Sequence, residues 1–214
     1  MINPHKIIIS LDGMNLAESV KIACALKDKV WGFKINDLLY EKSSTISILK
    51  RYGKIFADVK LFDIPNTVGN SVKRLSDQGV DIITVHASGG VDMMTSAKIN
   101  AGKSKIVAVT VLTSQTMNSK NKVIRLAKNA LRAGVDGIVC SGREADTIRN
   151  IKGFKKKLII VPGVRPLWYK NVDDQKRIVT PRNALDSGAN LLVVGRPIIF
   201  ANNPIEALQR ICRE

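Results

Sequence analysis

Short apolar runs rich in isoleucine and valine recur along the chain, and polar segments separate them. Each run is four to eight residues long, as expected of strands that are buried on both faces of a parallel sheet. The sequence therefore predicts eight buried strands, at residues 6–11, 30–35, 54–59, 81–86, 105–112, 136–140, 157–161 and 190–195.

The segments between these runs carry apolar residues at helical spacing, as at Leu16, Val20, Ala23 and Leu26. Several of them end on a glycine just before the next strand, as in "SDQGVDIITV", "LRAGVDGIVC" and "LDSGANLLVV". A glycine in this place is typical of a helix C-terminus that leads into an αβ loop. The pattern therefore predicts a helix after most strands.

Eight strand–helix units of roughly 27 residues favour a single-domain (β/α)8 TIM barrel that spans residues 1–214, near the short end of that fold's size range. A doubly wound open sheet is the alternative. The barrel is favoured because the count closes at eight and because no G-x-G-x-x-G motif follows the first strand.

Polar residues interrupt the apolar pattern where the predicted strands end. In a barrel these C-terminal strand ends converge on one mouth, where active sites of the fold are built. The residues are Asp12, Lys34, Asp58, Lys60, His86, Thr113, Ser114, Gly195 and Arg196. Any one of them could be a loop residue or a helix cap, but together they predict a functional site at the mouth.

The densest charge cluster lies in "ADVKLFDIPNT", residues 57–67. Side chains two positions apart on a strand point to the same side, so Asp58 and Lys60 are expected to project together. With Asp63 after the strand and Lys34 from the neighbouring strand, they would form an array of two ammonium groups and two carboxylates. Alternating charges of this kind can stay ionised in a confined site, whereas a lone buried charge would shift its pKa.

Two interpretations of this cluster remain open from the residues alone. One is a salt-bridge network that closes one end of the barrel. The other is catalytic: Lys60 donates a proton or stabilises a developing negative charge, while the carboxylates position it and repel an anionic group of a substrate.

The net charge of +16 is the unusual bulk property of the chain. It fits nucleic-acid binding or an anionic small substrate, because lysine and arginine neutralise phosphates. The sequence has no arginine-rich arm and no interleaving of basic and aromatic residues. A general drift of composition toward lysine on solvated helix faces is therefore favoured, and no nucleic-acid partner is expected.

The cysteines and histidines give little support for a disulfide framework or a metal site. Cys24, Cys140 and Cys212 are far apart and odd in number, which fits a reducing cytoplasm. Only His5 accompanies His86, so a histidine-based metal site is not expected, and without a partner histidine Cys140 is expected to fill the barrel rather than act as a nucleophile. No window reaches the length of an apolar membrane span, and the N-terminal segment lacks the pattern of a signal peptide.

The segment "DVKLFDIPNT" resembles the signature of the orotidine 5′-phosphate decarboxylase family. The resemblance continues in order through "AVTVLTS", "VPGVRP", "DDQKR", "TP" and "VVGRPI", and so covers nearly the whole chain. A bare D-x-K-x-x-D also occurs in related sugar-phosphate enzymes that use a metal ion. The "DIPNT" continuation favours the nucleotide decarboxylase.

The resemblance implies a cofactor-free, metal-free removal of CO₂ from orotidine 5′-phosphate, which gives uridine 5′-phosphate in pyrimidine synthesis. It implies that Lys60 stabilises and protonates the carbanion, that Asp58 crowds the leaving carboxylate, and that Lys34 and Asp63 complete the array. It also implies a homodimer in which Asp63 and Thr67 reach the neighbouring subunit's site.

The remaining substrate contacts also follow from the resemblance. Asp12 and Lys34 would contact the ribose, Thr113 would lie beside the pyrimidine, and the other residues would hold the substrate and its phosphate. These others are Ile64, Arg165, Gln175, Gly195 and Arg196. The long segment 163–180 is expected to form a lid over the phosphate, with Gln175 as its contact and with Trp168 and Tyr169 either packing it shut or exposed.

The chain departs from the family pattern at two places. Residues 35–37 read "IND", where the family often has a glycine-containing stretch, and "SLDG" places an unusual glycine after Asp12. Neither departure removes a charged group. The three functions that remain are the nucleotide decarboxylase, a metal-dependent sugar-phosphate enzyme and a basic nucleic-acid-binding barrel.

Overall fold

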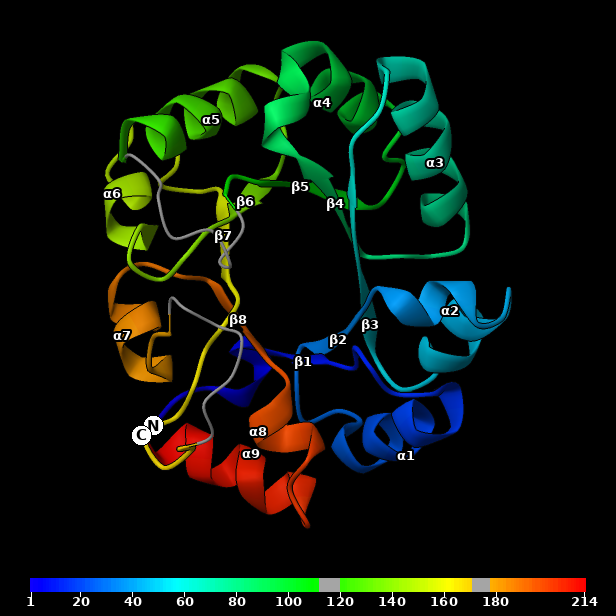
Figure 1. Ribbon diagram of the computed structural model, residues 1–214, viewed down its shortest axis with the longest axis vertical. Helices are drawn as coiled ribbons and strands as arrows, with labels where there is room; N and C mark the ends of the chain where they lie inside the picture. Colours follow the sequence, from blue (N-terminus) through cyan, green and yellow to red (C-terminus); the bar gives the residue numbers. More distant parts are fainter. Residues whose placement is uncertain (112–119, 171–177) are drawn as a thin grey trace.

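The computed structural model describes residues 1–111, 120–170 and 178–214. These residues form a closed barrel of eight parallel strands in sequence order, because β8 pairs with β1, and helices surround the ring (Figure 1). The predicted (β/α)8 TIM barrel is therefore confirmed. The strands are β1 (Ile7–Ser10), β2 (Gly32–Ile35), β3 (Lys54–Leu61), β4 (Ile82–His86), β5 (Lys105–Val109), β6 (Gly137–Val139), β7 (Leu158–Val161) and β8 (Leu191–Val194).

Helices follow the strands and form the outer layer. Short 3₁₀ helices lie at Pro4–Lys6, Asp37–Tyr40 and Ala87–Gly89. The α-helices in the described part of the chain are α1 (Leu16–Leu26), α2 (Thr45–Leu49), α3 (Pro65–Asp77), α4 (Gly90–Ile99), α5 (Lys120–Arg132), α6 (Ala145–Arg149), α7 (Pro181–Asp186), α8 (Arg196–Ile199) and α9 (Pro204–Arg213).

The strands are mostly apolar because most of their residues are buried on both faces of the sheet. One face packs against the helices, and the other fills the interior of the barrel. The interior plug consists of Ile8, Phe56, Ile82, Val107, Val109, Val139, Ile160, Leu191 and Val193, with Trp31 packed against it. This plug separates the two ends of the barrel.

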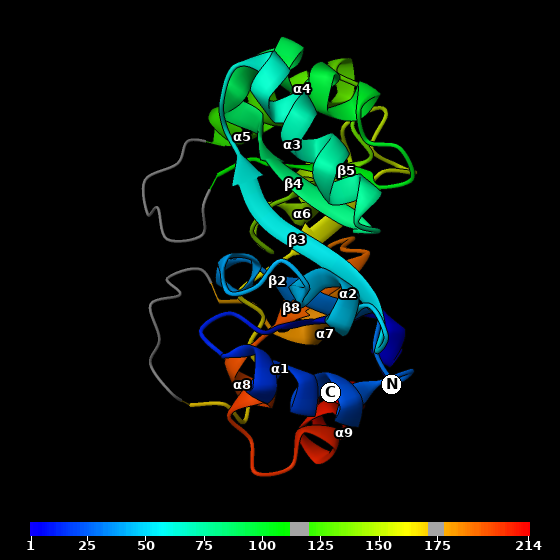
Figure 2. The same cartoon turned by 90° about the vertical axis from the view of Figure 1, so that its right-hand side faces the viewer.

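The predicted strand runs match the observed strands in number and order. Most observed strands are shorter by one to three residues, and β5 ends at Val109. In contrast, β3 reaches Leu61 and is the longest strand; Figure 2 shows its slant along the barrel. The extra length of β3 carries Lys60 into the mouth.

The N-terminal end of the barrel is held by a contact that repeats three times. The residues just before β4, β6 and β8 are Asp81, Asp136 and Asn190, respectively. In each case a side-chain oxygen of this residue accepts a backbone N–H from the preceding strand. We call these contacts the basal clamps. They join Ile55 N to Asp81 Oδ2, Ile106 N to Asp136 Oδ2 and Ile159 N to Asn190 Oδ1, each at 2.8 Å.

Each basal clamp also receives a cation from the helical layer. Lys50, which follows α2, pairs with Asp81, and Lys98 of α4 contacts both oxygens of Asp136 at 2.7 and 2.8 Å. Arg149 of α6 contacts Asn190 at 2.6 Å. The clamps therefore tie helices to strands as well as strands to each other.

The two ends of the chain meet, since the N–H of Ile2 donates to the carbonyl of Cys212 at 2.7 Å. Their markers also lie side by side in Figure 1. In the part of the chain that the structure describes, no helix has the length and apolarity needed to cross a bilayer.

Asp136→Ala should lower the free energy of unfolding by about 1.5–3 kcal/mol, because it leaves the N–H of Ile106 without its acceptor and Lys98 without its partner. Urea unfolding at a fixed protein concentration measures the change. Asp136→Asn keeps an acceptor, as Asn190 does, and should lose less.

The matched control is Asp77→Ala, which removes a solvent-exposed pair with Lys73 and should change stability by less than about 0.5 kcal/mol. If both alanine variants unfold at the same urea concentration, the clamp does not stabilise the barrel.

Candidate active site

A cavity of about 370 Å³ opens at the C-terminal ends of the strands. Its floor is the upper part of the interior plug, including Phe56, Val109, Val139 and Val193. Polar groups surround this apolar floor. They are Ser10, Asp12, Lys34, Asp58, Lys60, Arg165 and Arg196.

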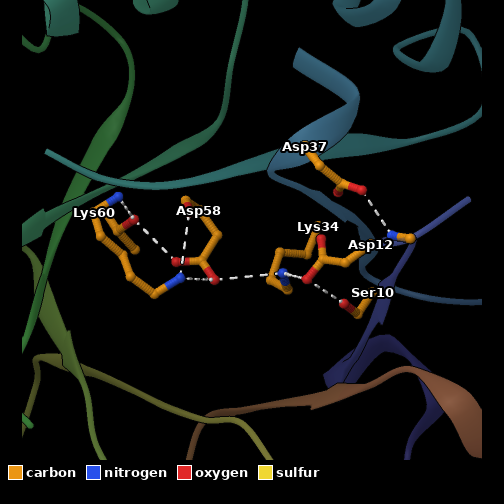
Figure 3. Close-up of polar contacts among 8 residues, drawn as sticks. Ser10, Asp12, Lys34, Asp37, Asp58 and Lys60 are labelled. Atoms are coloured by element: carbon orange, nitrogen blue, oxygen red, sulfur yellow. Dashed lines mark hydrogen bonds and ion pairs between the residues drawn. The ribbon is translucent and has the colours of Figure 1, made fainter. Parts of the chain in front are cut away.

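Four charged side chains form a continuous row across this cavity (Figure 3). Lys34 pairs with Asp12 on one side and lies 3.4 Å from Asp58 Oδ2 on the other. Asp58 Oδ2 also accepts a hydrogen bond from Lys60 Nζ at 2.8 Å. The row therefore alternates carboxylate, ammonium, carboxylate and ammonium.

The row differs in one member from the array expected within the chain. Asp12, and not Asp63, is the second carboxylate in contact with the lysines. Asp63 is exposed beyond the end of β3, where it accepts the N–H of Ile64 at 2.7 Å. Ile64, with 66% of its surface exposed, and Thr67 are also outside the residues that line the cavity.

Lys60 reaches the cavity through an irregular backbone. The pairing of β3 with β4 shifts register between Ala57 and Leu61, and Lys60 has a φ of 49°, in the left-handed region. The contact between Lys60 and Asp58 was predicted from a two-residue period. The structure reaches the same contact through a bulge, so regular alternation is not its cause.

Thr84 of β4, which was not among the predicted site residues, contacts both Asp58 and Lys60 of this bulge. Its hydroxyl oxygen accepts the backbone N–H of Lys60 at 2.8 Å, and its hydroxyl donates to Asp58 Oδ1 at 3.0 Å. Thr84 is fully buried. The threonine inside the apolar run "IITVH" could have indicated this role, because a buried hydroxyl needs a hydrogen-bond partner.

Asp58 stays ionised although its side chain is only 13% exposed. Burial by itself raises the pKa of this carboxyl. The ammonium groups of Lys34 and Lys60 outweigh burial, with hydrogen bonds from Lys60 and Thr84, and hold the pKa of Asp58 below its ordinary value. The cavity therefore contains a fixed negative charge between two positive ones.

The two departures from the family pattern contact each other. Gly13 has a φ of 77°, which a glycine adopts readily, and its N–H donates to Asp37 Oδ2 at 2.9 Å. Ser10, a second residue that was not among the predicted site residues, donates to Asp12 Oδ2 at 3.1 Å. These contacts fix the loop that presents Asp12.

The cavity lining also includes residues expected at the phosphate end. Arg165 is 7% exposed and lines the cavity together with Gly195 and Arg196. Gly195 packs closely, because a Cβ there would lie 3.2 Å from the Cβ of Ser10. Two arginines therefore line the same cavity as the Lys34–Asp58 pair.

Two predicted contacts, Thr113 and Gln175, lie outside the described residues. The base of the predicted lid is described: Val164 bridges Val179, and the N–H of Arg165 donates to the carbonyl of Val179 at 2.9 Å. Trp168 packs against the core beneath Arg210, whose guanidinium carbon lies 4.3 Å from the indole centre.

The other polar groups near the mouth do not form a metal site in the described part of the chain. Burial, and then Lys60 and Lys122, lower the pKa of His86, whose Nδ1 lies 2.7 Å from the hydroxyl of Ser88. Burial, with Glu144 adding to it, raises the pKa of the Cys140 thiol, so this cavity-lining cysteine stays protonated.

The chain is similar to known proteins over nearly its whole length. Residues 5–211 match the family model described as Orotidine 5′-phosphate decarboxylase / HUMPS family. A curated relative from Wigglesworthia glossinidia brevipalpis, named orotidine 5′-phosphate decarboxylase, is 41% identical over 96% of this chain and 95% of its own. A relative of the same name from Novosphingobium aromaticivorans is 42% identical over 99% and 98%.

Among solved structures, the orotidine 5′-phosphate decarboxylase from Lactobacillus acidophilus superposes with a TM-score of 0.84 at 33% identity and covers 98% of both chains. The family match spans residues 5–211, which include all eight strands of the barrel. The chain therefore belongs to the orotidine 5′-phosphate decarboxylase family.

Proposed function

We propose that this protein decarboxylates orotidine 5′-phosphate to uridine 5′-phosphate in pyrimidine synthesis. The observation that carries the proposal is the alternating row of Asp12, Lys34, Asp58 and Lys60 above an apolar floor. Family membership supports the same activity, because the curated relatives carry that name.

The proposed reaction breaks one carbon–carbon bond. CO₂ leaves without the bonding electron pair, which stays on the pyrimidine carbon as a carbanion. Lys60 stabilises this charge and transfers a proton to the carbon, and it regains a proton from water. The reaction consumes one proton and needs no metal or cofactor.

Asp58 supports this reaction in two ways. Its charge lies 2.8 Å from Lys60 and orients the ammonium toward the cavity. A carboxylate that stays ionised also repels the carboxylate of a bound substrate, and the repulsion is relieved when CO₂ leaves. Lys34 prevents Asp58 from becoming neutral, since it supplies the larger of the two stabilising charges.

The two ends of the cavity fit the two ends of this substrate. Arg165, Gly195 and Arg196 would hold the phosphate, because guanidinium groups make paired hydrogen bonds to phosphate oxygens. Asp12 and Lys34 would contact the ribose hydroxyls, while Thr113 and Gln175 would add contacts to the pyrimidine and the phosphate.

We also propose that the chain is a single domain that works as a homodimer in the cytoplasm. Asp63, Ile64 and Thr67 are exposed beside the mouth and do not line the chain's own cavity. This position supports a role in the neighbouring subunit's site, as the resemblance implies. Free cysteines in the described residues fit a reducing compartment.

Purified protein should convert orotidine 5′-phosphate in the presence of EDTA, followed as a change in pyrimidine absorbance. Lys60→Ala should reduce the rate by at least about a hundredfold, because it removes the proton donor and the charge beside the carbanion. Lys152→Ala, an exposed lysine outside the cavity, is the matched control. Loss of activity on chelation would instead favour a metal-dependent sugar-phosphate enzyme.

Thr84→Val keeps the shape of the side chain and removes both hydrogen bonds to the bulge. We expect kcat to fall by about tenfold or more with a smaller change in KM, because the charge of Lys60 is misplaced while the phosphate contacts remain. Thr84→Ser restores the hydroxyl and should recover most of kcat. Equal loss in the valine and serine variants would rule out the hydrogen bonds as the cause.

A mixed dimer tests the shared site. A Lys60→Ala chain paired with an Asp63→Ala chain has one composite site with both residues intact, so a purified heterodimer should show up to about half the wild-type activity. Each variant homodimer should be inactive. Verified heterodimers without activity would contradict a contribution of Asp63 to the neighbouring site.

A further inference from the structure

A second cavity opens at the opposite, N-terminal end of the barrel and belongs to none of the chemistry above. It has a volume of about 560 Å³, within the size range of small-molecule sites. The plug of apolar residues separates it from the proposed active site. Its lining includes Trp31, Lys50, Lys54, Asp77, Asp81, Ile82, Lys103, Lys105, Leu158 and Leu191.

Trp31 precedes β2 in the same way that the acidic or amide residues of the basal clamps precede β4, β6 and β8. The N–H of Trp31 donates to the carbonyl of Ile7 at 2.9 Å, just as Asp81, Asp136 and Asn190 donate to the preceding strand at 2.8–2.9 Å. The position before β2 is therefore equivalent to the clamp positions before β4, β6 and β8. A clamp side chain is replaced there by an indole that packs against the plug and borders the cavity.

The positive charges around this cavity exceed the negative ones. Asp81 is paired with Lys50, and Asp77 with Lys73 of the same helix. In contrast, Lys54, Lys103 and Lys105 are exposed and make no ion pair within the residues that the structure describes. Three lysines without an ion pair in the described residues thus line one hollow, and Lys54 Nζ lies 5.6 Å from the centre of the Trp31 ring.

The cavity combines an apolar lining with an uncompensated positive rim. Ile82, Leu158 and Leu191 offer no hydrogen bonds, and the indole offers a flat face. A ligand that fits both parts carries a planar ring and a cluster of negative charge. The high net charge of the chain would further concentrate such anions at the surface.

We propose that this cavity binds a nucleoside phosphate, with the base against Trp31 and the phosphates between Lys54, Lys103 and Lys105. The site is distinct from the proposed active site and lies at the other end of the barrel. It does not depend on the decarboxylation proposal, and a binding measurement tests it without any activity.

Fluorescence of Trp31 reports on the site directly. The chain has two tryptophans, so Trp168→Phe leaves Trp31 as the only one. Titration of this parent variant with uridine 5′-triphosphate should give saturable quenching below about 5 mM. Inorganic tripolyphosphate, which has the charge without the base, should bind at least about tenfold more weakly.

Matched lysine variants distinguish specific binding in this cavity from attraction by the overall net charge of the protein. Lys54→Gln, Lys103→Gln and Lys105→Gln, combined in the parent, should weaken the nucleotide at least about tenfold, because they remove the charges that face the phosphates. Lys21→Gln, Lys128→Gln and Lys152→Gln make the same change in net charge away from this cavity and should leave the affinity unchanged. Circular dichroism and the urea midpoint check that both triple variants fold.

Three results would overturn the proposal. They are the absence of quenching at about 5 mM nucleotide, equal weakening in the two triple variants, and equal affinity for tripolyphosphate and nucleotide. The second would mean that the net charge of the surface attracts the ligand, and the third that Trp31 takes no part.

Discussion

The mouth of the barrel depends on keeping the carboxylate of Asp58 ionised while most of it is withdrawn from water. An unpaired carboxylate there would cost several kcal/mol or take up a proton. Three contacts to the Asp58 carboxylate together outweigh this cost: Lys34 Nζ at 3.4 Å, Lys60 Nζ at 2.8 Å and the Thr84 hydroxyl at 3.0 Å. Because the two lysines are held by the same carboxylate, its charge also fixes the spacing of the two positive groups across the cavity.

The backbone at Lys60 also adopts an unfavourable conformation to build this site. A left-handed conformation at a residue with a side chain costs roughly 1–2 kcal/mol, and Lys60 adopts it with a φ of 49°. Thr84 compensates, because one hydroxyl accepts the N–H of Lys60 and donates to Asp58. Strain of this kind persists where the surroundings determine the geometry, and it is common at functional sites. Its position at Lys60 supports the role proposed for that residue.

The sequence predicted the barrel because strands that are buried on both faces must be apolar along their whole length, and such runs are visible without a structure. It also predicted that Lys34, Asp58 and Lys60 meet, since strand ends converge. It did not predict the bulge: nothing in "DVKL" marks a register shift, which arises from pairing with Thr84 of another strand. Nor did it place Asp12 beside Lys34 in the row, because that contact depends on a loop fixed by Ser10 and Asp37.

Carboxylates and cationic side chains lie at both ends of the barrel, but they stabilise the fold at the base and leave groups available to a ligand at the mouth. At the base, each clamp oxygen accepts a backbone N–H and meets a cation from a helix, so the fold itself satisfies these groups. At the mouth, Lys60 donates to Asp58 and stays 31% exposed to the cavity, with N–H groups to offer beyond that bond. Polar groups that the fold satisfies stabilise it, whereas those that it leaves partly unsatisfied are available to a substrate. Among the described positions before β2, β4, β6 and β8, Trp31 is the one without a clamp side chain. The end of the barrel that the clamps stabilise therefore also has a place for the proposed ligand.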